Sequence, residues 1–422
     1  MKQVFALCDC DSFYASCEKI FRPDLWHAPV VVLSNNDGFI IAASKEAKAL
    51  GYKTIEKPYF QLEDQLKRDK VAILSANFEL YGDISNRVFL VLSRFTPDIE
   101  VYSIDECFLL LGAQKDNLEF ARLLRETVWN WVGVPVSIGI GHTKTLAKVA
   151  TRWAKKHPEC KGVFDLTNHS DVDSVLDKVP VSDIWGVGRQ YASFLEQNNI
   201  STAKQLKYSP IKWAKQHMTV MGQRTVEELR GKPCFMLGHE PSAKKSILRS
   251  RSFGRLVYRI EDLNEALSAY TERACEQLRS QHSLTYGIQI FVTTNPHKNE
   301  PQYSNAVYSR LSMPTANTST MIKIAHHLLE KIYKPGYRYL KAGVILFDII
   351  DESLSPNNLF KTPYHLSKEY DLMKTVDKIN NNYGPRTVTM ASSGLEAKPW
   401  SMRQSSRSPR YTTRLSELRE VG

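Results

Sequence analysis

The chain has 422 residues, which is long for a single core, and length alone indicates about three domains. It is 42% hydrophobic and 24% charged, as soluble globular proteins are, and no apolar run approaches the ~20 residues of a membrane span, so we expect no membrane-spanning helix. Lys and Arg outnumber Asp and Glu by 56 to 45, for a net charge of +11. That balance fits either a solvated basic surface or a polyanionic partner such as nucleic acid.

The N-terminal residues and the cysteines indicate the compartment. Only a short apolar run precedes Asp9, so we expect no signal peptide. The seven cysteines include no Cys-x-x-Cys pair, and several lie in apolar, strand-like runs where a free thiol packs as a small hydrophobe. We therefore expect reduced cysteines, no zinc site and a cytoplasmic protein.

Strands and helices alternate up to about residue 168. The pattern predicts strands at 3–9, on both sides of the turn at 35–38, at 101–111 and at 134–141. Helices are predicted over 44–50, 83–95, 117–131 and 143–156. This order is typical of a sheet covered by helices on at least one face.

The remaining chain changes character twice. From about 169 the pattern predicts short helices with tight turns, followed by a Gly/Pro/Lys linker at 236–246. A small α+β unit follows, with strands at 248–260, 286–294 and 339–350 and helices at 263–280 and 318–333. After Asp351 the chain is polar, and we expect an extension that is partly disordered or ordered on a partner.

Two acidic clusters interrupt apolar strands. Asp105 and Glu106 are adjacent in "VYSIDECFLLL", and Asp9 and Asp11 end the first strand in "CDCDSFY". Strand residues alternate faces, so either the strand ends or bends at Asp105, or one carboxylate faces away. If the two strand ends are neighbours, the carboxylates could hold divalent cations, since Mg²⁺ prefers carboxylate and phosphate oxygens. The alternative is that these acids face water or cap helices.

The segments "CDCDSFYASCE", "YSIDECF" and "GIGHTKTLAKVA" resemble the palm motifs of Y-family translesion DNA polymerases. Together with "VDSVLDKVPVSDIWGVGR", "SRSFG" and the terminal "SPRYTTR", they resemble the UmuC-type catalytic subunits of bacterial DNA polymerase V. The resemblance spans residues 5–414. It implies a right-hand fold that combines α/β and α+β domains: a ferredoxin-like palm (1–14 and 79–168), small fingers (15–78), a helix-hairpin-helix thumb (169–236), an α+β little finger (244–351) and a C-terminal extension (352–422).

The resemblance also implies the roles of the active-site residues. Asp9, Asp105 and Glu106 match the catalytic carboxylates that hold two Mg²⁺ ions, and the main-chain carbonyl of Cys10 matches a further ligand. Asp11 matches a position that is not a required ligand.

Four further residues match contacts to the incoming nucleotide. Tyr14 matches the steric gate, whose ring leaves no room for a 2′-hydroxyl, and Phe13 is the neighbouring aromatic residue. Lys48 and Lys148 match lysines that contact the triphosphate. Core packing for Tyr14 and a solvated helix face for each lysine are the alternatives.

DNA contacts are expected in the thumb and little finger. Gly186 and Gly188 let the backbone approach a DNA phosphate. Arg249, Arg251 and Arg255 occupy alternate strand positions, so all three can face one side, and "YRYLKAG" adds Arg338 and Lys341.

The extension is expected to bind partners. Leu359 and Phe360 end a segment that matches a sliding-clamp peptide, but Pro356 replaces the glutamine that usually opens it. The Arg-rich end resembles the region linked with the processed UmuD-type dimer and the RecA filament.

The resulting hypothesis is an error-prone polymerase that adds deoxynucleotides to a primer on damaged template DNA in the SOS response. Two alternatives remain open at this point. One is a nucleotidyl cyclase-like palm enzyme, and the other is a non-catalytic DNA-binding scaffold derived from a polymerase.

Overall fold

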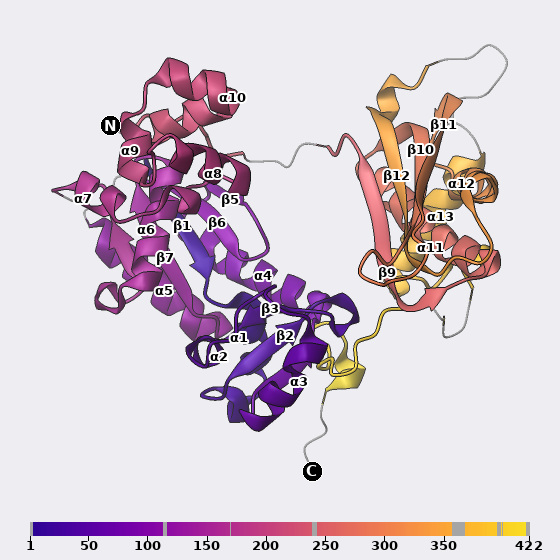
Figure 1. The fold of residues 1–422 in the computed structure, drawn as a ribbon, viewed down its shortest axis with the longest axis horizontal. Coiled ribbons are helices and arrows are strands. Elements are labelled where there is room, and N and C mark those ends of the chain that lie inside the picture. The colour runs from indigo at the N-terminus through magenta and orange to yellow at the C-terminus, as the bar shows by residue number, and fades with distance from the viewer. Residues whose placement is uncertain are drawn as a thin grey trace. The chain divides into compact units, whose positions relative to one another are not determined.

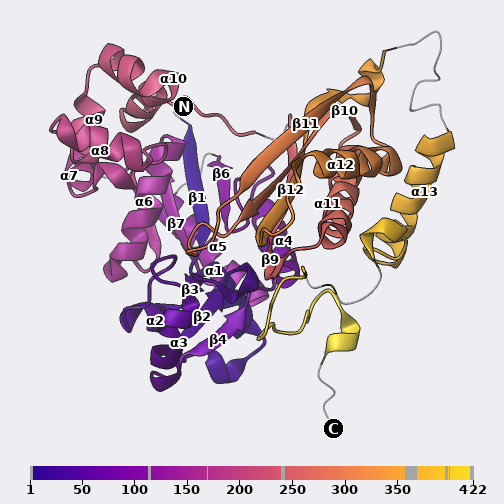
Figure 2. The same ribbon diagram turned by 45° about the vertical axis from the view of Figure 1, so that its right-hand side comes forward.

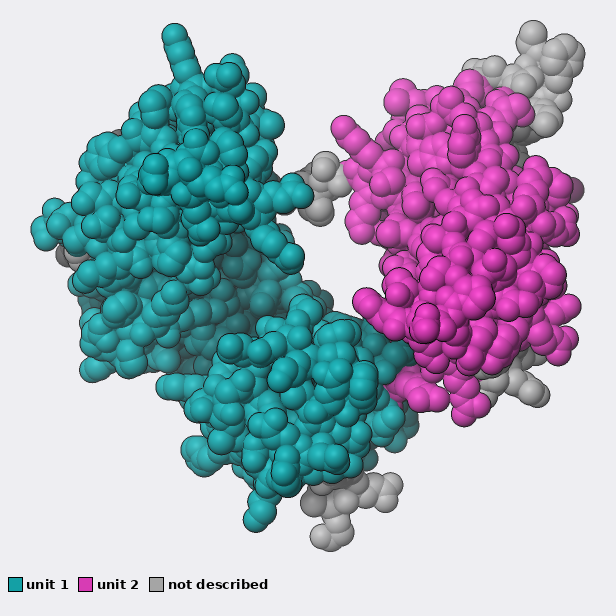
Figure 3. All heavy atoms as spheres, in the orientation of Figure 1, with its two compact units in different colours: residues 1–241, 405–422 teal, residues 242–404 magenta. Residues whose placement is uncertain are grey.

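The computed structural model describes residues 3–112, 116–168, 170–238, 243–356, 368–394, 398 and 400–418. The chain divides into two compact units, residues 1–241 with 405–422 and residues 242–404 (Figure 3). Each unit has its own hydrophobic core. All seven cysteines lie in the described residues and are free thiols, as expected. Among the described helices, none combines the length and the apolar character that crossing a bilayer requires.

The first unit is organised by a five-stranded sheet in the order β5-β6-β1-β7-β8 (Figure 1). The strands are β1 (Val4–Cys10), β5 (Ile99–Val101), β6 (Glu106–Leu111), β7 (Val136–Gly141) and β8 (Val163–Asp165). Along β1, Ala6 and Cys8 face the core shared with α4 (Phe78–Ser93) and α5 (Asn117–Val132). Phe5 and Leu7 face the opposite side, where α6 (Lys144–Lys156) packs. The alternation of strand side chains therefore places Asp9 on the α6 face.

The expected strand at 101–111 is two strands. β5 ends at Val101 and β6 begins at Glu106, and the two pair antiparallel. Tyr102 and Ser103 both donate their amide N–H to the carbonyl of Glu106, which closes a tight turn. The first of the two alternatives for the paired acids is therefore correct, because Asp105 lies in this turn and Glu106 opens the next strand.

Helix α6 packs directly on the backbone of β7. A Cβ atom placed on Gly139 would lie 1.9 Å from the Thr151 amide nitrogen and 2.5 Å from the Ala147 carbonyl oxygen. Thr151 in turn donates its hydroxyl to the Leu7 carbonyl, 3.2 Å away. Only glycine permits this approach, which fixes α6 against the centre of the sheet.

A second sheet in this unit has the order β3-β2-β4, formed by β2 (Val30–Leu33), β3 (Ile40–Ala43) and β4 (Ala72–Ser75). Its two faces are covered by α1 (Phe13–Ile20) and by α2 (Lys45–Ala49) with α3 (Tyr59–Arg68). The predicted strands on both sides of the turn at 35–38 are confirmed.

The helical part of the unit follows residue 170. It comprises α7 (Val172–Asp177), α8 (Arg189–Gln197), α9 (Ala203–Tyr208) and α10 (Ile211–Leu229), the last interrupted at Thr219. Its core is continuous with α6 through Leu146 and Val149. The element directly before Gly186 is a 3₁₀ turn, Val181–Asp183, where the helix-hairpin-helix expectation placed a helix.

The second unit is a four-stranded antiparallel sheet in the order β11-β10-β12-β9. The strands are β9 (Ile247–Val257), β10 (Ser283–Thr294), β11 (Ser304–Thr315) and β12 (Tyr339–Asp351). Helices α11 (Ile260–Ser280) and α12 (Thr318–Ile332) pack together on one face, which both views show (Figures 1 and 2). This is the α+β unit that the sequence predicts.

The C-terminal extension divides between the two units. Helix α13 (Lys368–Tyr383) belongs to the second unit, where Asp377 pairs with Arg279 of α11 at 2.6 Å. Residues 405–418 belong to the first unit. The described residues of the extension therefore pack on their own chain, and its expected ordering on a partner stays a prediction.

The first-unit part of the extension, residues 405–411, runs beside β4. Ser75 donates its amide to the Ser406 carbonyl at 3.0 Å, and the Ser406 amide donates to the Ser75 hydroxyl. Ser408 is buried; its hydroxyl donates to Glu18 at 3.1 Å and accepts from the Asn77 side-chain amide at 3.0 Å. The Tyr411 ring is stacked on Phe21. These contacts anchor the segment to α1 and to the start of α4.

We predict that Gly139→Ala destabilises the protein by about 3 kcal/mol, because the added methyl group meets helix backbone that cannot move aside without unpacking α6. Differential scanning calorimetry checks this through a lower melting temperature. The matched control is Gly82→Ala, within α4 and with open space around it, which should stabilise by roughly 0.5–1 kcal/mol. Equal effects of the two substitutions would contradict the close approach of α6.

We predict that Ser408→Ala accelerates tryptic cleavage after Arg407 several-fold, because it removes the hydrogen bonds to Glu18 and Asn77 that hold this segment. Timed proteolysis with mass spectrometry measures the rate. Ser405→Ala is the control, because Ser405 bonds Asp37 through its backbone amide. An unchanged cleavage rate in Ser408→Ala would show that the anchor lies elsewhere.

Candidate active site

Three carboxylates meet on the α6 face of the first-unit sheet. Asp9 on β1 lies directly opposite Glu106 on β6 in the antiparallel pairing. Asp105 precedes Glu106, and its carbonyl accepts the Cys10 amide at 2.9 Å, which ties the turn to the end of β1. Like charges at opposed strand positions repel, so this arrangement requires positive charge nearby.

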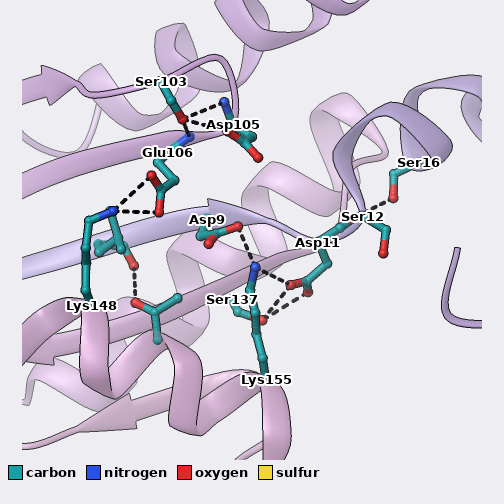
Figure 4. A network of polar contacts seen from close by, with 12 residues as sticks. Asp9, Asp11, Ser12, Ser16, Ser103, Asp105, Glu106, Ser137, Lys148 and Lys155 are labelled. Carbon is teal, nitrogen blue, oxygen red and sulfur yellow. Dashed lines mark hydrogen bonds and ion pairs between the residues drawn. The ribbon is translucent and has the colours of Figure 1, made fainter. Parts of the chain in front are cut away.

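Two lysines of α6 supply that charge (Figure 4). Lys148 Nζ lies 2.9 and 3.0 Å from the two carboxylate oxygens of Glu106. Lys155 Nζ lies 2.5 Å from Asp9 Oδ1 and 3.4 Å from Asp11 Oδ1. Because the residues are seven positions apart, they project from the same side of the helix. One helix therefore neutralises acids from two strands.

The electrostatics of Asp9 reflect its burial. Burial raises the pKa of Asp9 to about 6; Lys155 opposes that shift, and the charges of Glu106 and Asp105 add to it. Burial lowers the pKa of Lys155, but Asp9 and Asp11 outweigh it, so the pKa of Lys155 lies above its ordinary value. Asp9 thus lies in a pocket that favours a bound positive charge.

The donor set suits a hard divalent cation. Carboxylate oxygens and a main-chain carbonyl are the ligands that Mg²⁺ prefers. In the part of the chain that the structure describes, however, no three acidic, His or Cys side chains form a ready-made metal group. Lysines hold Asp9 and Glu106, while Ser103 donates to Asp105 at 2.6 Å. The oxygen atoms of these residues are suitable ligands for a divalent metal ion. In this structure the lysines of α6 supply the positive charge that such an ion would supply.

The predicted nucleotide residues lie beside these acids. The Tyr14 ring is stacked on Tyr81 with centroids 4.7 Å apart and meets Phe78 edge-on. Tyr81 donates its hydroxyl to the buried Glu18 carboxylate, which also accepts from Ser408. Tyr14 is half-buried, so one side of its ring is held by the core while the residue still reaches the surface. Phe13 is buried and supports α1.

Lys48 projects from α2 toward the start of α1. Its Nζ donates to the Ser12 hydroxyl at 2.8 Å, and Ser12 has a left-handed backbone conformation, φ 47°. Burial lowers the pKa of Lys48, and the charge of Lys155 lowers it further. The two lysines are thus close enough to act on one anion, although they come from α2 and α6.

Lys144, the first residue of α6, has a structural role and does not pair with the three carboxylates of the site. It is buried, pairs with Glu100 at 2.6 Å and donates to the Met236 carbonyl at 2.9 Å.

Two residues of the site were not predicted from the sequence. The first is Lys155, whose signal is its seven-residue spacing from Lys148. The second is Ser137, which donates to both Asp11 oxygens at 2.9 and 3.0 Å and so fixes Asp11 away from the paired acids.

The expected thumb residues lie at the start of α8. Gly186 has φ 89°, a conformation that L side chains rarely adopt, and Gly188 caps α8. The preceding Trp185 donates its indole N–H to the Tyr102 hydroxyl at 3.0 Å. Lys148 lies 4.3 Å from the centroid of that Tyr102 ring. This contact links the turn to the palm acids.

In the second unit, the register between β9 and β12 shows on which face of the sheet Arg249 and Arg251 lie. Arg249 and Arg251 pair with Val344 and Ala342, whose side chains are buried beneath the helices. Arg249 accordingly bonds Gln277 of α11 at 2.6 Å. Both arginines lie on the helix-covered side of β9, where Arg251 is largely buried. They do not point from the open face.

The other basic residues of this unit differ in placement. Lys341 pairs with Ser252 and Thr293 and lies over the Phe291 ring on the open face. Arg338 pairs with Glu300 at 3.0 Å, and Arg255 is exposed near an irregularity in β9. Leu359 and Phe360, the expected clamp-binding residues, lie outside the described residues.

Comparisons with known sequences cover nearly the whole chain. Residues 8–152 match the profile of the impB/mucB/samB family, and residues 244–359 match that of its C-terminal domain. Residues 370–421 match a domain of unknown function. Protein UmuC of Salmonella typhimurium is 43% identical over 99% of this chain and 100% of its own length. Protein MucB of Escherichia coli is 35% identical over 97% of both chains.

More distant matches support the same fold. DNA polymerase IV 2 of Halalkalibacterium halodurans is 27% identical over 94% of this chain and 96% of its own. A Y-family polymerase chimera of Dbh and Dpo4 superposes with a TM-score of 0.64, at 20% identity, over 82% of this chain and 99% of that one. The right-hand polymerase fold implied by the motifs is thereby confirmed. The chain belongs to the impB/mucB/samB family, within the UmuC-type branch of the Y-family translesion DNA polymerases, and is a DNA-directed DNA polymerase.

Proposed function

We propose that the chain extends a primer 3′-hydroxyl opposite damaged template, using deoxynucleoside triphosphates and two Mg²⁺ ions held by Asp9, Asp105, Glu106 and the Cys10 carbonyl. The observation that carries this proposal is the pairing of Asp9 with Glu106 across β1 and β6, with Asp105 at the strand's start. When bound, the ions would lower the pKa of the 3′-hydroxyl and stabilise charge at the α-phosphate.

The chain's own residues would perform the remaining tasks. Lys148 and Lys155 now neutralise Glu106 and Asp9, and each would exchange its carboxylate for a phosphate oxygen when a nucleotide binds. Lys48, near Lys155, would meet the same triphosphate. Tyr14, backed by Tyr81, would block a 2′-hydroxyl by its shape.

DNA contacts in this proposal are phosphate contacts. Gly186 and Gly188 expose backbone amides at the start of α8, and the open face of the second unit carries Lys341. Arg255 and Arg338 would add to them, whereas Arg249 and Arg251 would contribute through the edge of β9. Their common signature is affinity that falls steeply with salt.

The biological setting is also a proposal. The family relationship and the free thiols support a cytoplasmic, nucleoid-associated enzyme of the SOS response. The expected partners are a processed UmuD-type dimer, the RecA filament and, through Leu359 and Phe360, the sliding clamp.

Primer extension tests the function directly. A 5′-labelled primer is extended with Mg²⁺ on an undamaged and on an abasic template, with and without the UmuD-type dimer and RecA filament. Synthesis past the lesion that an Asp105→Ala/Glu106→Ala variant lacks would support the proposal. DNA binding without incorporation under every condition would favour the scaffold alternative, and pyrophosphate release without primer and template would favour the cyclase alternative.

We predict that Asp105→Ala reduces primer extension by more than about 100-fold, as loss of a group that stabilises transition-state charge does. Primer–template affinity, measured by fluorescence anisotropy, should stay within a few-fold of wild type, since the Asp105 side chain is only partly buried and is not part of the hydrophobic core. Equal losses of activity and affinity would make Asp105 a structural residue.

We predict that Tyr14→Ala raises incorporation of ribonucleotides relative to deoxynucleotides by on the order of 10- to 100-fold, because the ring no longer occupies the space of a 2′-hydroxyl. Single-nucleotide insertion kinetics with both substrates measure the ratio. Phe13→Leu is the control, since Phe13 is buried in the core and should affect both substrates equally. An unchanged ratio in Tyr14→Ala would remove Tyr14 from the nucleotide site.

A further inference from the structure

The second unit contains a cavity of about 380 Å³, and Arg251 is its only lining residue with a role above. It lies between β9, α11 and described residues of the match to the domain of unknown function, namely Arg386, Thr389, Gly394, Lys398 and 400–402. Four of its lining residues are basic: Arg251, Arg273, Arg386 and Lys398. None of its described lining residues is acidic.

The acids nearest to this cavity are already engaged. Glu265 pairs with Lys398 at 3.2 Å. Glu272 accepts hydrogen bonds from the Thr389 hydroxyl, the Met390 amide and the Ser393 hydroxyl, at 2.8, 3.0 and 3.0 Å. Within the described residues, neither Arg273 nor Arg386 forms an ion pair with a carboxylate, and Glu276 acts on Arg273 through its charge alone.

The basic groups also act on one another. Burial lowers the pKa of Arg251, and the charge of Arg273 lowers it further. Burial likewise lowers the pKa of Lys398; the hydrogen bond with Glu265 opposes that shift, and the charge of Arg386 adds to it. Of the four cations that line this partly buried place, only Lys398 has a carboxylate partner among the described residues, and an anion would offset the remaining positive charge.

Two aromatic residues complete the lining. Tyr270 and Trp400 are 3% and 7% exposed, and their rings meet edge-on with centroids 5.9 Å apart. Among the described residues, the Tyr270 hydroxyl and the Trp400 indole N–H have no hydrogen-bond partner. A buried polar group left unpaired costs about 1–3 kcal/mol, so such donors are expected to find an acceptor.

We propose that this cavity binds a phosphate-bearing anion between the little-finger helix α11 and the C-terminal segment. Arginine forks match the geometry of phosphate oxygens, and several cations around one centre favour a multiply charged group over a single carboxylate. The volume lies within the range of small-ligand pockets, and the aromatic pair offers a surface for the rest of the ligand. The phosphate belongs either to a free ligand or to the backbone of single-stranded DNA.

Isothermal titration of the full chain with inorganic pyrophosphate tests the site. Divalent ions are removed with EDTA, which suppresses metal-assisted binding at the palm. Wild type is expected to bind pyrophosphate, and Arg273→Gln/Arg386→Gln is expected to weaken binding at least about tenfold, as loss of charged hydrogen bonds does. The control Arg259→Gln removes an exposed arginine that pairs with Glu261, and it should bind as wild type does.

The two phosphate sources are separated by a competition arm. A short single-stranded oligonucleotide that displaces pyrophosphate identifies the DNA backbone as the source, and one that binds without displacing it identifies a free ligand; each supports the site. No binding in wild type, or equal affinity in wild type and the double variant, would overturn the proposal.

Two further measurements separate ligand loss from unfolding. Without ligand, the double variant should melt no lower than wild type, because it relieves repulsion. If the double variant does not fold, Tyr270→Phe replaces it, since this change removes only the unpartnered hydroxyl. We expect several-fold weaker pyrophosphate binding in Tyr270→Phe, and unchanged affinity there would overturn the proposal.

Discussion

The structure of the active site depends on one unfavourable pair, Asp9 opposite Glu106 in neighbouring strands. Like charges at such positions repel, and burial makes the repulsion worse. The compensation comes from a single helix, because Lys148 and Lys155 of α6 each reach one of these acids. They reach them only because Gly139 lets α6 lie directly on the backbone of β7. A packing constraint at one glycine thus positions the charges on which the proposed metal chemistry depends.

The C-terminal extension has a part in both units. Ser408, in its first-unit part, bonds Glu18, which also holds Tyr81 beneath Tyr14, so the wall of the proposed nucleotide pocket depends on a contact from the C-terminal extension. Its earlier part closes a basic cavity against α11. A segment that looks polar and unstructured in sequence therefore contributes to two candidate sites. The residues that match the domain of unknown function therefore have a structural role in both units.

Much of the fold was predictable from the sequence, because periodic apolar residues define α5 and the uninterrupted apolar run of β7 defines a buried strand. The motif residues of the candidate site were predictable by resemblance. Contacts between distant positions were not: nothing in the sequence pairs Lys155 with Asp9 or Ser408 with Glu18. The strand register could not be predicted from the sequence either. Alternate spacing correctly places Arg249 and Arg251 on one side of β9, but only the pairing of β9 with β12 shows that this side faces the helices.

The central claim is that Asp9, Asp105 and Glu106 form a metal site in which lysines now occupy the place of cations. Mn²⁺ titration followed by electron paramagnetic resonance, with primer–template and a non-hydrolysable deoxynucleotide present, tests it most directly. The account predicts two bound ions in wild type, as two-metal sites hold, their loss in Asp9→Ala, and their retention in Asp11→Ala, since Ser137 and Lys155 already engage Asp11. Retention of both ions in Asp9→Ala, or their loss in Asp11→Ala alone, would contradict the account.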